Sequence, residues 1–226
     1  MNDFDNLLIP IWKDTDWTSN DIIKFIKPYL KPHKIGHSGT LDPFAEGILL
    51  ICIGKMTKQV SKLMELKKEY QARIMLGKRT DTLDLTGKIN KQKKYIKKND
   101  SSINEVLTKF IGETNQVPPM FSALKHKGQR LYKLARQGVN IQRNPRPVFI
   151  ESIKLLTNNE KYIDIEVVCG KGTYIRSLAR DIAIELGTYG YLSKLSRTKV
   201  GEFDYNSSIS IKDFKSWILS KQHFQN

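Results

Sequence analysis

The sequence predicts an α+β fold in which helices flank one mixed, mostly antiparallel central sheet. The chain has 226 residues, enough for one large domain. Its composition, 39% hydrophobic and 27% charged, is ordinary for a globular protein with a packed core. Most strand-like runs are neighbours in sequence or are separated by a single helix, which favours antiparallel pairing. Because no repeat or linker divides the chain, we expect a single domain over residues 1–226.

Helical periodicity and capping residues predict the first helix over residues 18–31. Thr18 and Asp21 form a capping-box pattern, and the apolar residues that follow recur on one face. A glycine-rich loop at 36–47 then leads into a buried strand at 48–53. The remaining elements follow the same periodicities and are, in chain order, a helix at 56–66, a strand at 69–76, a helix at 103–111, strands at 148–156 and 161–169, and helices at 173–186 and 211–219.

Two stretches lack a clear period. Residues 88–100 are rich in lysine and nearly devoid of apolar side chains, which predicts a solvated loop rather than an RNA contact. Residues 115–147 are irregular and rich in proline, glycine and basic side chains, with a short helix near 131–137. An excursion of this length inside a compact domain is usually functional or mobile.

The formal net charge is +15 and the isoelectric point is about 9.7. Such an excess favours a polyanionic partner, nucleic acid first, because each neutralised phosphate releases counterions. The alternative is a lysine-rich compositional bias. The longest apolar run, Gly47–Gly54, is far shorter than the roughly 20 residues of a membrane span. The amino terminus is acidic where a signal peptide is basic, so we expect a cytoplasmic protein with no membrane partner.

The cysteines and histidines do not form a metal-binding pattern. Cys52 and Cys169 lie in apolar strand-like runs, and the four histidines are scattered along the chain without the spacing of a zinc site. We therefore predict two buried thiols, no disulfide and no metal.

One loop concentrates the residues that could perform chemistry. Between Lys34 and Gly47, glycines, Pro43 and small hydroxyl residues surround Asp42. Glycines permit sharp turns and proline stiffens the chain, so such a loop presents a carboxylate at a fixed position, as a nucleophile or general base requires. From spacing alone, a turn or helix-capping role for Asp42 is the favoured alternative. The nucleophile-elbow pattern fails because residue 40 is threonine.

A second segment, Cys169–Asp181, reads as a strand, a glycine turn and a helix that begins near Thr173. Arg176 lies beside the apolar stripe of this helix. An arginine held there could pair with a carboxylate through bidentate hydrogen bonds that lysine cannot copy. The alternative is a surface arginine in contact with solvent.

The loop around Asp42 resembles the catalytic loop of the bacterial tRNA pseudouridine-55 synthases, the TruB family. The resemblance extends over about residues 18–203. Its further matches follow the order of the family and are Lys68-Glu-Tyr70, Gly77-Lys-Arg-Thr-Asp-Thr82 with Asp84 and Gly87, Pro118-Pro-Met-Phe-Ser-Ala-Leu-Lys125, Leu131-Tyr-Lys-Leu-Ala-Arg-Gln-Gly138, the Gly170 segment, and Leu192-Ser-Lys-Leu-Ser-Arg197.

The resemblance implies a pseudouridine synthase that isomerises the uridine at position 55 in the T arm of tRNA, without cofactor or metal. Asp42 matches the catalytic aspartate, which acts first on the flipped nucleotide. Tyr70 matches the tyrosine that stacks on the uracil, and Arg176 matches the arginine that pairs with the aspartate. Leu195 matches the apolar residue of the uracil pocket. The alternative for Tyr70 and Leu195 is ordinary core packing.

The resemblance also implies an RNA-binding surface. His37 matches a histidine that inserts into the RNA as bases are flipped; its alternative is a turn histidine bonded to backbone. Residues 115–147 match an RNA-clamping insertion. The other RNA contacts that we expect are Lys13, Gly39, Thr40, Lys125, Arg136 and Tyr174.

The chain departs from the family pattern at two places. Residues 12–16 keep Lys13 but lack the proline and glycine that family members usually have there. The carboxy-terminal RNA-binding, PUA-like domain is expected to be absent or truncated. We expect a monomer that binds tRNA without an obligatory protein partner. The rival interpretations are a catalytically silent RNA-binding or RNA-chaperone protein and a synthase that acts on ribosomal RNA or another tRNA site.

Overall fold

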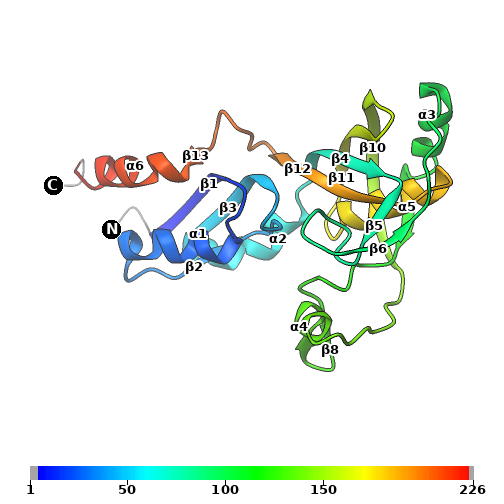
Figure 1. Ribbon diagram of the computed structural model, residues 1–226. Helices are drawn as coiled ribbons and strands as arrows, with labels where there is room; N and C mark the ends of the chain where they lie inside the picture. Colours follow the sequence, from blue (N-terminus) through cyan, green and yellow to red (C-terminus); the bar gives the residue numbers. More distant parts are fainter. Residues whose placement is uncertain (1–4, 224–226) are drawn as a thin grey trace. The chain divides into compact units, whose positions relative to one another are not determined.

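The computed structural model describes residues 5–223, which form two compact units (Figure 1). The first unit contains the described residues up to Tyr70 together with those from Leu195 onward, and the second contains residues 71–194. Two strands, β4 (Lys68–Leu76) and β12 (Gly190–Val200), have residues in both units. The sequence predicted one domain and did not separate these units, because no linker or change in composition marks either boundary.

The sheet of the first unit has the strand order β13-β1-β3-β12. β1 (Asn6–Lys13) runs antiparallel to β3 (Glu46–Gly54) along its whole length, and β2 (Ile35–His37) is a second antiparallel partner of β3. β13 (Ile209–Ser210) is parallel to β1, and β12 is parallel to β3 at Arg197. The sheet is therefore mixed, as predicted.

β3 is buried on both faces, so it reads as a continuous apolar run rather than an alternating one. One face packs against α1 (Ser19–Ile26) and α6 (Ile211–His223) in a cluster of Ile9, Ile11, Ile22, Ile26, Leu30, Leu49, Ile51, Ile53, Ile211, Phe214 and Ile218. The other face packs Ile48 and Leu50 with Val200 and with Leu63 of α2 (Val60–Glu65). Thr18 caps α1 through the predicted capping box with Asp21.

The second unit has the strand order β12-β4-β11-β10-β7. β10 (Arg146–Asn158) runs antiparallel to both β11 (Tyr162–Cys169) and β7 (Gly112–Gln116). Its helices include α3 (Asp100–Thr108) and α5 (Ile175–Glu185). The predicted apolar stripe of α5 is confirmed, because its members are all buried: Ile175, Leu178, Ala179, Ile182 and Leu186.

The prediction of a structureless loop at 88–100 is wrong in its first part. β6 (Ile89–Gln92) pairs antiparallel with β5 (Lys78–Thr80). All four residues of β6 are exposed, so this strand carries no alternation of apolar and polar side chains. Its pairing depends on backbone hydrogen bonds, which leave no hydrophobic signal in a sequence.

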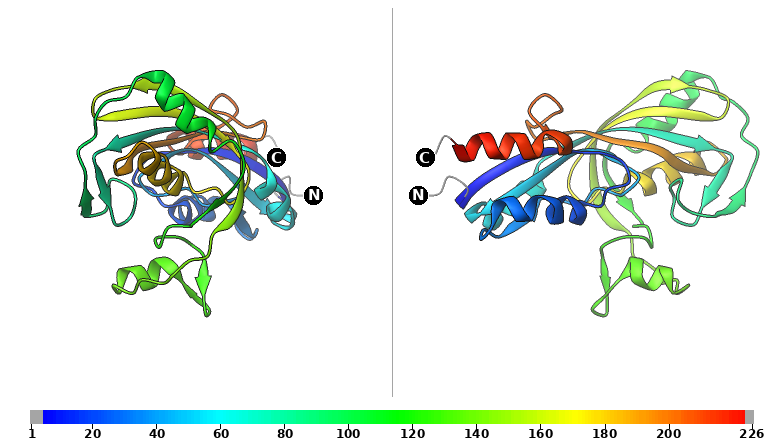
Figure 2. Two further views of the ribbon diagram at one scale, coloured as in Figure 1. Left: turned by 90° about the vertical axis from the view of Figure 1, so that its right-hand side faces the viewer. Right: turned by 60° about the vertical axis from the view of Figure 1, so that its left-hand side comes forward.

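The irregular region 115–147 contains a short hairpin and a short helix. β8 (Lys125–His126) pairs with β9 (Gln129–Arg130), and α4 (Leu131–Arg136) follows directly. Both views in Figure 2 show this segment standing apart from the sheet of the second unit. The predicted short helix is confirmed.

Both cysteines are free and buried, as predicted. Burial raises the pKa of the Cys52 thiol to about 11, so this thiol stays protonated at neutral pH. Within residues 5–223, the helices are too short or too polar to cross a membrane. Residues 1–4, which carry part of the acidic amino terminus, lie outside the described residues.

Candidate active site

The Asp42 loop, residues 38–45, connects β2 to β3 in the first unit. Gly39 begins its turn with a φ of 108°, a left-handed conformation that glycine adopts without penalty. The Ser38 N–H donates to the Leu50 carbonyl at 3.0 Å, and the Ala45 N–H donates to the Asp42 carbonyl at 3.1 Å. These bonds hold Asp42 half-buried at the tip of a tight turn.

The Asp42 loop is also attached to the first turn of α1. Ser19 Oγ accepts a hydrogen bond from the Leu41 N–H at 3.0 Å and donates one to the Leu41 carbonyl at 3.3 Å. Leu41, Phe44 and Ala45 are buried. The side chains on either side of Asp42 therefore anchor the loop, while Asp42 itself stays accessible.

Lys13 lies beneath the Asp42 loop and is fully buried. Its ammonium donates to the carbonyl oxygens of Asp14 (2.9 Å), Trp17 (2.8 Å), Pro43 (3.4 Å) and Ala45 (2.5 Å). Burial lowers the pKa of Lys13 to about 8, against a raising effect from the negative charge of Asp42. An ammonium has three hydrogens, and here all are directed at protein carbonyls, so Lys13 supports the loop backbone. The RNA contact of Lys13 stays a prediction.

Arg197 of β12 is a second buried cation beside the Asp42 loop, and only 2% of its surface is exposed. Its Nε donates to the Ile48 carbonyl at 2.7 Å, while its two terminal nitrogens donate to the Thr40 and Gly39 carbonyls at 3.4 Å each. Arg197 is the last residue of the Leu192–Arg197 motif, and no role was expected for it. The available signal was its position two residues after Leu195, which places both side chains on one face of a strand.

The parallel pairing of β12 with β3 requires glycine at position 47. Gly47 has a φ of 121°, and a Cβ added there would lie 2.2 Å from the Arg197 carbonyl oxygen. We expect Gly47→Ala to lower the free energy of unfolding by about 3 kcal/mol, since backbone strain and a backbone clash add. Denaturant unfolding followed by circular dichroism measures the change.

Gly39→Ala is the matched control for this substitution. Its φ of 108° carries a similar strain, but an added Cβ would meet nothing within 4 Å. It should destabilise the protein less than Gly47→Ala. Equal losses would show that the contact with β12 does not determine the need for glycine.

His37, the last residue of β2, is partly buried and lies near the charge of Arg197. Burial lowers the pKa of its imidazole, and the charge of Arg197 lowers it further, against the raising effect of a hydrogen bond that the ring donates to the Gly39 backbone. The ring is therefore neutral at physiological pH and can stack as a flat, uncharged group. Its insertion into RNA stays a prediction, as do the RNA contacts of Gly39 and Thr40.

Tyr70 and Leu195 are both buried, with 8% and 6% of their surfaces exposed. Tyr70 lies in β4 and Leu195 in β12, as the strand-like patterns indicated. Burial agrees with a uracil pocket and with ordinary core packing alike. Their assignment to the substrate pocket stays a prediction.

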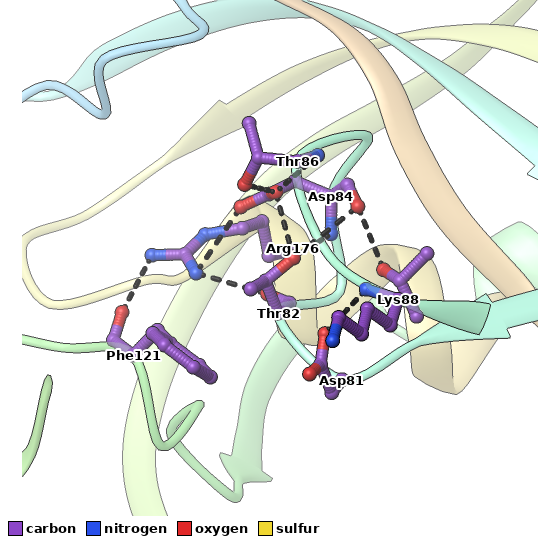
Figure 3. A network of polar contacts seen from close by, with 8 residues as sticks. Asp81, Thr82, Asp84, Thr86, Lys88, Phe121 and Arg176 are labelled. Carbon is purple, nitrogen blue, oxygen red and sulfur yellow. Dashed lines mark hydrogen bonds and ion pairs between the residues drawn. The ribbon is translucent and has the colours of Figure 1, made fainter. Parts of the chain in front are cut away.

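In the second unit, Arg176 lies at the start of α5 and is buried, with 4% of its surface exposed (Figure 3). One terminal nitrogen donates to the Thr82 carbonyl at 3.0 Å, and the other donates to the Phe121 carbonyl at 2.8 Å. The first nitrogen also lies 3.5 Å from Asp84 Oδ2. The alternative of a solvent-exposed arginine is therefore wrong.

Asp84 is the carboxylate that faces Arg176 in this network (Figure 3), and it too is buried. Its Oδ1 accepts hydrogen bonds from the hydroxyls of Thr82 (2.7 Å) and Thr86 (2.6 Å) and from the Thr86 N–H (3.0 Å). Oδ2 is thereby left to face the guanidinium. Asp84 belongs to one of the matched motifs, but its pairing with Arg176 was not predicted.

The base of the irregular region is anchored to the first turns of α5. The Tyr174 N–H donates to Gln116 Oε1 at 2.8 Å, and Ser177 Oγ donates to the Val117 carbonyl at 2.8 Å. Arg176 adds its bond to the Phe121 carbonyl. The segment that carries the exposed side chains of Lys125 and Arg136 is therefore attached to the helix of Arg176.

The structure brings the site residues together in two groups. Lys13, His37, Gly39, Thr40 and Asp42 gather around one loop of the first unit. Tyr174 and Arg176, with the segment that follows Gln116, belong to the second unit. The pairing of Asp42 with Arg176 stays a prediction.

Comparison with known families gives two matches that together cover most of the chain. The model for the TruB family pseudouridylate synthase N-terminal domain matches residues 27–175. The model for the tRNA pseudouridylate synthase B C-terminal domain matches residues 176–226, a stretch that the sequence analysis assigned to the catalytic domain.

Individual relatives agree with the family models. The tRNA pseudouridine synthases B of Clostridium tetani and Clostridium acetobutylicum are 43% and 44% identical, over 92% and 91% of this chain and 72% and 71% of their own lengths. A chain in the crystal structure of a Cbf5–Nop10–Gar1 complex has a TM-score of 0.75 at 27% identity, covering 99% of this chain and 57% of that one. The chain belongs to the TruB family of pseudouridylate synthases, which are isomerases.

Proposed function

We propose that this protein converts the uridine at position 55 in the T arm of tRNA to pseudouridine, with Asp42 as the catalytic carboxylate. The anchored Asp42 loop is the observation that carries the proposal. Hydrogen bonds from Ser19, Lys13 and Arg197 fix its backbone while the Asp42 side chain stays half-buried. A preorganised carboxylate of this kind suits nucleophilic or general-base chemistry. The names of the relatives support tRNA as the substrate.

The proposed reaction is an isomerisation. The bond between the sugar and uracil N1 breaks, the uracil turns, and C5 bonds to the same sugar carbon. C5 then loses its proton, and N1 takes up a proton, so that the atoms balance. Asp42 acts first, either by attacking the nucleotide or by removing a sugar proton. Tyr70 stacks on the uracil and Leu195 lines its pocket. Because nothing is oxidised and no group is added, the proposed reaction uses no cofactor.

Arg176 has an electrostatic role in this proposal. A carboxylate that is enclosed by substrate needs a cationic partner, since burial alone raises its pKa. Arg176 is suited to that role because Thr82, Asp84 and Phe121 already fix its guanidinium plane. His37 fills space left by a flipped base, which recovers part of the stacking energy that extrusion costs.

The region 115–147 is the proposed RNA clamp. No acidic residue lies between Glu113 and Glu151, and the stretch carries seven cations, Lys125, Lys127, Arg130, Lys133, Arg136, Arg143 and Arg146. Six of them have exposed side chains, Arg143 being the half-buried one. Basic side chains on a projecting segment can follow an RNA backbone by charge and shape.

Pseudouridine mapping tests the proposed function directly. Unmodified tRNA is incubated with the purified protein, and pseudouridine is located by a chemistry specific for that nucleoside. A signal confined to the T-arm uridine supports both the reaction and the site. A signal elsewhere would contradict the assigned position, and binding without product would favour a silent RNA-binding protein.

We expect tRNA binding to depend steeply on salt. If the clamp and neighbouring cations neutralise several phosphates, the association constant should fall by about 10³-fold or more between roughly 50 and 200 mM salt. Replacing Lys125, Lys127 and Arg130 by glutamine should weaken binding and make the salt dependence shallower. Fluorescence anisotropy with labelled tRNA measures both effects.

The control for the clamp variant is the glutamine substitution of Lys212, Lys215 and Lys221, exposed lysines of α6. This change removes the same charge at another place. If both triple variants weaken binding equally, only net charge matters and the clamp assignment is wrong.

We further propose that the protein acts as a cytoplasmic monomer without an obligatory protein partner. Light scattering of the purified chain, alone and with equimolar tRNA, tests the oligomeric state. Activity of the purified protein in the mapping experiment tests the need for a partner.

A further inference from the structure

We infer that Arg197 is a positioning residue for the reaction: its guanidinium fixes the backbone of the Asp42 loop, so that Asp42 is held ready to react. This inference rests on the proposed function, because it gives Arg197 a role only through Asp42. Arg197 ends a matched motif, but no role followed from that match. The role follows from the hydrogen bonds of its side chain to Ile48, Thr40 and Gly39.

One planar group joins three segments of the first unit. Arg197 itself belongs to β12, its Nε binds the Ile48 carbonyl of β3, and its terminal nitrogens bind the carbonyls of Gly39 and Thr40 in the loop. The bond to Ile48, at 2.7 Å, is the shortest of the three. It anchors the guanidinium on the sheet, from which the two longer bonds reach the turn two residues before Asp42.

The requirement is for arginine rather than for a positive charge. A guanidinium presents donors in a rigid fork, whereas a lysine ammonium is one compact point on a flexible stem. An ammonium at position 197 cannot reach Ile48, Thr40 and Gly39 together. Each carbonyl that it leaves unpaired would lose its hydrogen bond, and the buried Ile48 carbonyl would gain no water in exchange.

The position of the Arg197 backbone is fixed as well. Arg197 pairs with Gly47 across β12 and β3, where only glycine leaves room for its carbonyl. Because that pairing sets the register of β12, the side chain always starts from the same point beside the loop. Its charge is felt by His37 and Lys13, which makes the His37 imidazole a reporter of position 197.

The test compares Arg197→Lys and Arg197→Met with the wild type. Arg73→Met is the matched control, since Arg73 is an arginine of β4 in the second unit whose guanidinium pairs with Asp164 at 2.7 and 2.8 Å. Three quantities are measured: the single-turnover rate of pseudouridine formation, the dissociation constant for tRNA, and, on the free protein, the His37 pKa with the amide exchange rates of Leu41 and Ala45 by NMR.

We expect Arg197→Met to slow turnover by about 10²-fold, the effect of a misplaced catalytic group, and to leave tRNA affinity within about threefold of the wild type. The pKa of His37 should rise in Arg197→Met and stay lowered in Arg197→Lys, because lysine keeps the charge. Turnover should nevertheless remain slow in Arg197→Lys, and amide exchange at Leu41 and Ala45 should be faster in both variants.

Full recovery of turnover in Arg197→Lys would overturn the inference, because charge alone would then suffice. An unchanged rate in Arg197→Met would overturn it too. If Arg197→Met fails to fold, Arg197→Lys carries the test. If the wild type forms no pseudouridine, the proposed function fails. Amide exchange at Leu41 and Ala45 then decides whether Arg197 fixes the loop. Exchange rates that stay unchanged in the Arg197 variants would show that it does not.

Discussion

Replacing Asp42 by asparagine is expected to abolish pseudouridine formation while tRNA binding stays nearly intact. Asparagine keeps the size of the side chain, so the loop contacts of Leu41, Phe44 and Ala45 persist. It removes the negative charge that a nucleophile or general base needs. We expect the single-turnover rate to fall by at least about 10³-fold, equivalent to about 4 kcal/mol of transition-state stabilisation.

The measurement is a time course of product under excess enzyme, beside a binding titration with the same tRNA. Asp204→Asn is the control, because it removes one carboxylate from an exposed turn elsewhere in the first unit. Its rate should match that of the wild type. Turnover by Asp42→Asn within about tenfold of the wild type would remove Asp42 from the chemistry.

The second large effect is expected from Arg176→Lys. The guanidinium serves the Thr82 and Phe121 carbonyls with two different nitrogens and faces Asp84 with one of them. A single ammonium cannot keep these contacts together, so the cation would move and leave a buried carbonyl unpaired. We expect turnover to fall by about 10²-fold, as for other displaced catalytic groups.

Thermal unfolding separates this effect from a loss of structure. Arg73→Lys, at the partly exposed pair with Asp164, is the matched substitution and should leave turnover unchanged. Asp84→Asn keeps the shape of the network but removes the negative charge of Asp84. Like Arg176→Lys, it should slow turnover. A normal rate for Arg176→Lys would show that the arginine network is dispensable for the reaction.

The sequence predicted an element of the fold well wherever the residues that determine this element are close together in the chain. The capping box of Thr18 and Asp21 set the start of α1, and the apolar stripe of α5 identified its buried face. Both signals arise from residues three or four positions apart, which the geometry of a helix brings together in any environment. The glycine-rich composition of residues 36–47 likewise marked a turn.

Predictions were less successful where the partner was distant in sequence. β6 was missed because exposed strands carry no apolar alternation, and its partner β5 precedes it by a loop. The burial of Lys13 was not predicted, because a lysine in a sequence does not reveal whether it is buried. Its ammonium is covered by the carbonyls of Pro43 and Ala45, some thirty residues away.

The sequence by itself determined the family and the mixed α+β fold, and it located the glycine-rich loop around Asp42. These features depend on ordered motifs and short-range periodicity. Only the tertiary structure decided what each cation does. Lys13 and Arg197 became supports of the Asp42 loop, and Arg176 was fixed by Asp84, because folding buried them beside backbone carbonyls and a carboxylate. A buried charge must be paired or hydrogen-bonded, and those partners come from distant segments of the chain.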